Sequence, residues 1–249
     1  MSYQRYVSNE LAHFLGRSLS SDDERYALLI KVIKSGWITH PPHNPNISGN
    51  LLIEPNKKIS ENEMFNPEMI CFCDIPINYL DIHMMKYSYF GISFSKQYLV
   101  ENGATPLLYL PKESKVSVYK TENFNHYLEK VNKSEYFDKM IKEYHELMSL
   151  FECLVDEKFQ TIGVSEESKR VRDLRRFLDF HLLSYLKFFD HKKSDDDPDN
   201  YYMEREWRVI GNLNFSISDI QRVILPKQYS DKFHADVPEY SGDLIFSTN

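Results

Sequence analysis

The chain has little cysteine and little glycine, and each shortage excludes a class of protein. The three cysteines, Cys71, Cys73 and Cys153, are an odd number and too few for a disulfide framework. Because the N-terminus is polar and lacks a signal peptide, this count predicts a reducing, cytoplasmic environment. With 8 glycines in 249 residues, and neither a Gly-x-Gly-x-x-Gly motif nor a P-loop, the sequence argues against a phosphate-cradling loop.

The sequence also lacks a long apolar segment and an excess of positive charge. No apolar run approaches the ~18 residues of a membrane span, so we expect no membrane partner. The net charge of −7 gives no overall attraction to nucleic acid or anionic lipid. The hydrophobic share of 42% and the aromatic share of 14% are enough for a core, which predicts one large domain or two small ones.

A strand followed by a capped helix is the clearest local signal. Residues 9–17 are typical of a short strand. Ser21 stands three positions before Glu24, which is a capping box, and apolar residues follow at helical spacing. Gly36 is typical of a helix C-cap, so we predict a helix between Ser21 and Gly36.

Strand-like segments at both ends of the chain enclose a helical middle. Residues 122–189 carry apolar stripes at helical spacing, whereas residues 40–66 have little periodicity and predict a loop. A further helix is expected from Asp74 to about Tyr87. Strands are expected at 69–73, 90–95, 106–110, 115–119, 206–211, 220–225 and 244–246. The fold class is therefore α+β, with core segments 1–121 and 191–249 and a helical insertion at 122–190.

The pentapeptide Glu-Arg-Glu-Trp-Arg at 204–208 places two carboxylates two positions apart. In an extended strand, Glu204 and Glu206 would share one face, and Arg205 would share the other with Trp207. A carboxylate that faces a cleft can hold a sugar hydroxyl and stabilise a developing positive charge. The alternative is an edge strand whose charged side chains form ion pairs.

Two other clusters favour simpler interpretations. Cys71, Cys73 and His83 lack the second paired cluster of a structural zinc site, so we expect no metal. The basic run at 169–176 places three arginines on one helix face, which can bind nucleic-acid phosphates. We favour a solvated helix face, or a partner for the acidic loop at 195–197.

Four segments, in their order and spacing, resemble the AbiGi family of abortive-infection (phage-resistance) proteins. They are Leu-Ala-His-Phe-Leu-Gly-Arg at 11–17, Cys-Phe-Cys-Asp-Ile-Pro at 71–76, Gly-Ile-Ser-Phe-Ser-Lys at 91–96 and the pentapeptide at 204–208. The resemblance covers most of the chain and is weakest in the helical middle. It implies a role in phage defence, and the family has been described as an antitoxin component.

The layout is more distantly similar to ADP-ribosyltransferases, particularly DarT-like enzymes that modify DNA. In those enzymes an early strand carries a histidine and a helix follows it. The segment around His13 looks like that strand, and the predicted helix that ends at Gly36 looks like that helix. Their catalytic glutamate stands near the start of a late strand, and Glu206 looks like that glutamate. This resemblance implies an ADP-ribosyltransferase-like split β-sheet core. The chain departs from the pattern at 74–76, where Asp-Ile-Pro replaces a characteristic arginine, and it has no Ser-Thr-Ser motif.

The same resemblance implies NAD as co-substrate and a set of site residues. Glu206 would stabilise the oxocarbenium character that develops on the ribose, and Glu204 would orient or deprotonate the acceptor. His13 would contact the adenosine-side ribose or the nicotinamide, and Arg17 would pair with the pyrophosphate. Ser93 would line the floor of the pocket beside the nicotinamide.

The expected function is therefore a cytoplasmic, NAD-dependent mono-ADP-ribosyltransferase that acts as the toxic effector of a phage-defence system. Its acceptor would be nucleic acid or protein, and its partner an inhibitor or antitoxin protein. The alternative is a non-catalytic, antitoxin-like binding module with the same fold. The enzyme requires Glu206 and His13 to face one cleft, whereas the binding module would hold Glu206 in an ion pair with a nearby arginine.

Overall fold

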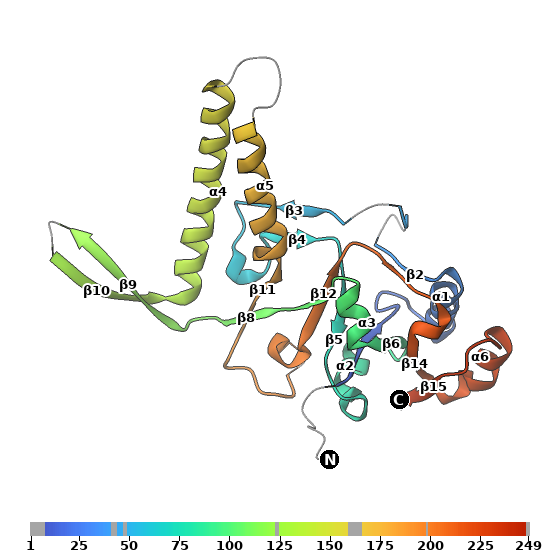
Figure 1. The fold of residues 1–249 in the computed structure, drawn as a ribbon. Helices are drawn as coiled ribbons and strands as arrows, with labels where there is room; N and C mark the ends of the chain where they lie inside the picture. Colours follow the sequence, from blue (N-terminus) through green and yellow to red (C-terminus); the bar gives the residue numbers. More distant parts are fainter. Residues whose placement is uncertain are drawn as a thin grey trace, which may run out of the picture. The chain divides into compact units, whose positions relative to one another are not determined.

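A computed structural model describes residues 8–40, 44–46, 49–122, 125–158, 166–197 and 199–247. It confirms the α+β class. The chain forms two compact units. Figure 1 shows the elements of both units, coloured along the sequence from blue to red. The first unit comprises 1–50, 68–107 and 194–249, and the second comprises 51–67 and 108–193.

A seven-stranded sheet forms the centre of the first unit, in the order β15-β14-β6-β1-β5-β12-β7. Neighbouring strands are antiparallel, except that β14 and β15 are parallel. The strands are β1 (Glu10–Phe14), β5 (Met69–Cys73), β6 (Gly91–Ser95), β7 (Thr105–Pro106), β12 (Glu206–Ile210), β14 (Ile220–Pro226) and β15 (Asp243–Ser247). A small second sheet pairs β2 (Trp37–Ile38) with β13 (Leu213–Asn214).

The two faces of this sheet differ in chemistry. Ala12 pairs with Cys73, and Cys73 pairs with Glu206, so these three side chains point to one face. The neighbouring residues Leu11 and Phe72 point to the opposite face, where they belong to the main apolar core. That core also takes in residues of α1 (Asp22–Ser35), α3 (Lys96–Glu101) and α6 (Ser230–Asp236). The first face carries the charged Glu206 together with a second apolar cluster, to which Ala12 and Cys73 belong.

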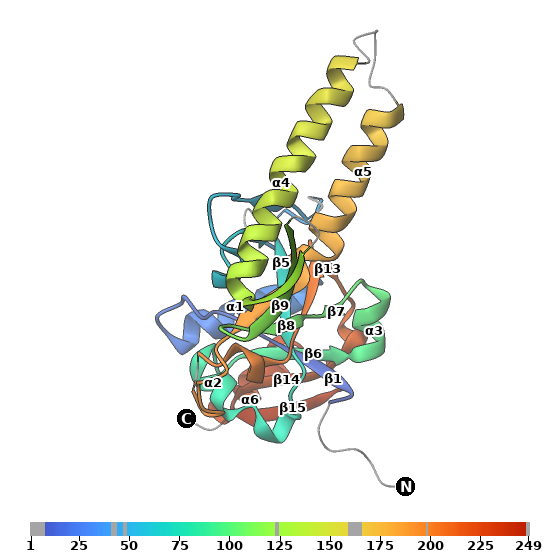
Figure 2. The same cartoon turned by 90° about the vertical axis from the view of Figure 1, so that its left-hand side faces the viewer.

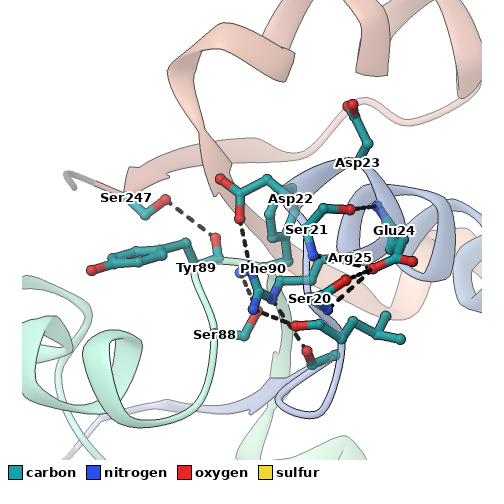
Figure 3. A network of polar contacts seen from close by, with 12 residues as sticks. Ser20, Ser21, Asp22, Asp23, Glu24, Arg25, Ser88, Tyr89, Phe90 and Ser247 are labelled. Carbon is teal, nitrogen blue, oxygen red and sulfur yellow. Dashed lines mark hydrogen bonds and ion pairs between the residues drawn. The ribbon is translucent and has the colours of Figure 1, made fainter.

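Helix α1 forms where the sequence predicts it, and Figure 3 shows its N-terminal contacts. The Ser21 hydroxyl accepts a hydrogen bond from the Glu24 backbone N–H at 3.3 Å, and the Ser21 backbone N–H donates to the Glu24 carboxylate at 3.1 Å. Gly36 ends the helix with φ 68°, the left-handed region that favours glycine. The buried residues Tyr26, Leu29 and Ile33 fix the helix on the apolar core.

Two predictions for the first half of the chain are wrong. Residues 40–66 are not all loop, because they contain β3 (Leu51–Ile53), η1 (Ile59–Glu61) and β4 (Phe65–Pro67). Asp74 does not cap a continuous helix. Its carboxylate accepts hydrogen bonds from the Ser8 backbone N–H and from Lys96 Nζ, and the chain continues through η2 (Ile77–Tyr79) and α2 (Asp81–Lys86). These contacts are distant in sequence and leave no local pattern.

The second unit contains two long helices and several strands. Figure 2 shows α4 (Lys133–Lys158) and α5 (Glu166–His181) side by side. Residues 122–189 are not uniformly helical, because β10 (Asn125–Asn132) pairs with β9 (Lys115–Glu122) and β11 (Leu186–Phe189) pairs with β8 (Leu108–Pro111). Within the basic run, Arg175 of α5 forms an ion pair with Glu152 of α4 at 3.3 Å, which gives this arginine a structural role.

Gly36 and Gly103 offer a test of what ends α1. Both have positive φ, but a Cβ at position 36 would lie 2.7 Å from the Phe215 carbonyl oxygen, whereas one at position 103 would meet nothing within 4 Å. Gly103→Ala should cost about 1 kcal/mol of unfolding free energy from backbone strain alone. Gly36→Ala should cost at least about 1 kcal/mol more because of the clash. Both tryptophans, Trp37 and Trp207, belong to the first unit, so urea unfolding followed by tryptophan fluorescence measures both variants. Equal losses would show that the Phe215 contact is relaxed.

Candidate functional site

His13 and Glu206 point to opposite faces of the central sheet. Glu206 shares its face with Cys73 and Ala12 through the strand register, and His13 follows Ala12 on the same strand. His13 instead packs near the Phe72 ring, with 5.6 Å between ring centroids. This placement corrects the expectation that the two side chains border one hollow.

The His13 ring is held by the backbone of a neighbouring strand. Its Nδ1 donates a hydrogen bond to the Cys71 carbonyl oxygen at 2.8 Å. Burial lowers the pKa of His13 below its ordinary value of 6.5, and the nearby His40 lowers it further, although the hydrogen bond to Cys71 opposes both effects. His13 is therefore neutral at pH 7 and serves the packing between β1 and β5.

Glu206 is buried beside an arginine of its own strand. Its Oε1 accepts a hydrogen bond from Arg208 Nε at 2.7 Å, and the two side chains are exposed by only 7% and 9%. They meet because residues two apart on a strand share a face. A carboxylate in a buried ion pair is neutralised and positioned by its partner. This is the arrangement that the binding-module alternative requires.

Glu204 does not lie on the strand that carries Glu206. It ends the short helix η4 (Tyr201–Glu204), and the left-handed Arg205, with φ 46°, separates it from β12. The sequence analysis predicts both glutamates on one extended strand. The structure instead places Glu204 in η4 and Glu206 in β12. The Arg205 guanidinium lies 3.6 Å from the Asp74 carboxylate.

Tyr87 brings three of the predicted residues into one neighbourhood. Its hydroxyl donates to Glu204 Oε1 at 2.5 Å, and the same oxygen accepts from Lys86 Nζ at 2.7 Å. The Arg17 guanidinium lies 5.2 Å from the centre of the Tyr87 ring, a cation–π distance. Burial raises the pKa of Tyr87 strongly, and the charges of Glu204 and Glu206 raise it further. Tyr87, which the sequence analysis missed, is thus a neutral donor at the centre of a charged cluster.

Ser93 is fully buried and bonded to another acid. It lies on the same sheet face as Glu206, but the strands β1 and β5 separate the two residues. Its hydroxyl donates to Glu10 at 2.5 Å, and Glu10 also forms an ion pair with Arg222. The structure therefore groups Arg17, Glu204 and Glu206 around Tyr87 and leaves His13 and Ser93 elsewhere. The residues predicted to hold NAD do not form one site.

A cavity of about 310 Å³ lies beside this cluster in the first unit. Of the predicted site residues, only Glu204 lines it. The remaining lining comes from the segment 75–86 and the loop 195–205, including His83, Lys86 and Asp195. The acidic run in this loop was the signal that could have located the cavity. No group of three or more His, Cys, Asp or Glu side chains within the described residues could hold a metal ion.

The fold and these contacts define an α+β protein whose sheet-face acids are engaged in internal ion pairs. A family model described as "Putative abortive phage resistance protein AbiGi, antitoxin" matches residues 51–236. The chain therefore belongs to the AbiGi family, which confirms the resemblance, and three of the four sequence segments lie within the matched range. No curated protein and no solved structure matches the chain.

The family description corrects the predicted role. The expectation of a toxic, NAD-dependent ADP-ribosyltransferase is contradicted, because the family is described as an antitoxin. The expected link to abortive infection and phage defence is supported by the same description. Among the described residues, no helix has the length and apolar character needed to cross a membrane.

The buried pair of Glu206 and Arg208 can be tested by a double-mutant cycle. Glu206→Met removes the carboxylate that bonds to Arg208 Nε from a buried pair and should cost about 3 kcal/mol of unfolding free energy. Adding Arg208→Met removes the guanidinium as well and should recover most of that loss. Fluorescence-monitored urea unfolding measures the first unit for each variant. Additive losses in the double variant would mean that the two side chains do not stabilise each other.

Proposed function

We propose that the chain is an antitoxin-like binding module of a phage-defence system, which neutralises its toxin by association and without turnover. One observation carries the proposal. Glu206, the residue best suited to catalysis in the sequence, is held in a buried ion pair with Arg208, and His13 points to the other sheet face. The antitoxin description of the family supports the same role.

The charge of the chain indicates the partner's chemistry. A net charge of −7 favours association with a toxin that presents a basic surface, because complementary potentials accelerate encounter and suppress wrong partners. The rigid, internally paired sheet then serves as a scaffold for the binding surface. NAD binding and the likeness to the ADP-ribosyltransferase split sheet stay predictions from the sequence.

Stoichiometry separates a binding module from an enzyme. We expect the purified chain, titrated against the toxin of its own defence system, to reduce toxin activity linearly and to abolish it at a molar ratio of about one. The toxin should co-purify with the chain at unchanged mass, because no group is transferred to it.

A parallel incubation with labelled NAD provides the control. We expect no release of nicotinamide and no label on RNA, DNA or protein pools. Neutralisation at far below equimolar amounts, or label that is retained on one pool and lost on Glu206→Gln, would contradict the proposal. Growth arrest by the chain expressed alone would contradict it as well.

A further inference from the structure

The cavity beside α2 lies outside the ion pair of Glu206 and Arg208. Its volume is about 310 Å³, at the lower end of the range for small-ligand pockets. Ile75, Ile82 and Met203 contribute an apolar wall. Charged side chains from α2 and from the segment 195–205 also line it. An apolar wall beside charged groups suits a ligand with a hydrocarbon stem and a polar head.

A buried histidine in the cavity lining has an unsatisfied ring nitrogen. His83 is 6% exposed, and its Nε2 has no hydrogen-bond partner among the described residues. Buried polar atoms are nearly always bonded, so this nitrogen indicates a missing partner. Burial lowers the pKa of His83, which keeps the ring neutral at pH 7. The tautomer with the ring proton on Nδ1 leaves Nε2 as an acceptor, which a hydrogen-bond donor in the cavity would satisfy.

The charges that line the cavity are unbalanced. Four carboxylates face two cations, since the lining contains Asp81, Asp195, Asp197, Glu204, Lys86 and Arg205. Lys86 is engaged by Glu204 at 2.7 Å, and Arg205 lies near Asp74, outside the lining. Asp81 and Asp195 form no ion pair with any residue that the structure describes. The cavity therefore favours a cation.

We propose that this cavity binds the guanidinium group of an arginine side chain presented by the toxin, an inference that rests on the proposed function for its partner. Arginine carries five N–H donors and no acceptor, so one head group can serve the His83 nitrogen and separate carboxylates at once. Its aliphatic stem packs on the apolar wall. The ammonium of lysine is a compact point charge and matches such divided acceptors less well.

The site can be tested without the toxin. N-acetyl-arginine N-methylamide, titrated into the isotope-labelled full-length chain, should shift the imidazole nitrogens of His83 in a saturable way at millimolar concentrations. The matching citrulline compound, which has the same shape and no charge, should bind at least about five-fold more weakly. No saturable shift at His83, or equal binding of the citrulline compound, would overturn the proposal.

Two adjacent aspartates supply matched variants. Asp195→Asn should weaken binding of the arginine probe about five-fold, because Asp195 lines the cavity. Asp196→Asn should leave it unchanged, because Asp196 does not line the cavity and bonds to Ser194. Backbone amide spectra confirm that each variant is folded. Equal effects of the two changes, or none from either, would contradict the site.

The toxin forms a separate arm of the experiment. If the toxin supplies the arginine, Asp195→Asn should weaken its complex with the chain about five-fold, and the free probe should compete with it. Probe binding without any toxin binding would leave the cavity site intact and refute the proposed function. Tight toxin binding that is equal for the parent chain, Asp195→Asn and His83→Phe would refute the assignment of the arginine to the toxin.

Discussion

The register of β1, β5 and β12 is the constraint on which the first unit depends. Pairing of Ala12 with Cys73, and of Cys73 with Glu206, decides which side chains enter the apolar core and which face the charged side. A slip of one residue would exchange every side chain between the faces. It would bury Glu206 and Arg208 in a core that holds Phe72 and Val209. Burying charges among apolar side chains costs free energy comparable to the whole stability of a domain.

The buried acids on the charged face are each paired with a cation or a hydroxyl donor. An acid that enters a partly buried sheet face must be neutralised, because an unpaired buried charge costs several kcal/mol. Here Glu206 is engaged by Arg208, Glu204 by Lys86 and Tyr87, and Glu10 by Arg222 and Ser93. Burial also raises the pKa of the Cys73 thiol to about 12, which leaves it an uncharged neighbour of these groups. The face consequently carries three separate charged groups, each of which is paired internally.

Local patterns predicted the elements that local contacts determine. The cap of α1 needs only Ser21, Glu24 and Gly36, and the strand at 206–210 follows from its apolar alternation. The sequence could not place Glu204, because the left-handed turn at Arg205 accompanies a long-range bond from the Asp74 backbone N–H to the Arg205 carbonyl. It predicted a strand at 115–119 but missed β10, the second strand of the β9–β10 hairpin, because residues from 122 onward have a helical pattern that strand pairing overrides. The cavity depends on segments more than a hundred residues apart, and no spacing rule brings them together.

Internal pairing suits a protein that acts by association. A binding surface loses affinity when its side chains must be ordered on contact, and it gains when they are already fixed. The contacts around Tyr87 hold the neighbouring cations and acids in place before any partner arrives. Catalysis makes the opposite demand, since a carboxylate that stabilises developing charge must be directed at the reacting atoms and not at a neighbouring guanidinium. In this chain the fixed side chains of Glu204 and Arg17 agree with the proposed binding role, and the Glu206 carboxylate is directed at Arg208.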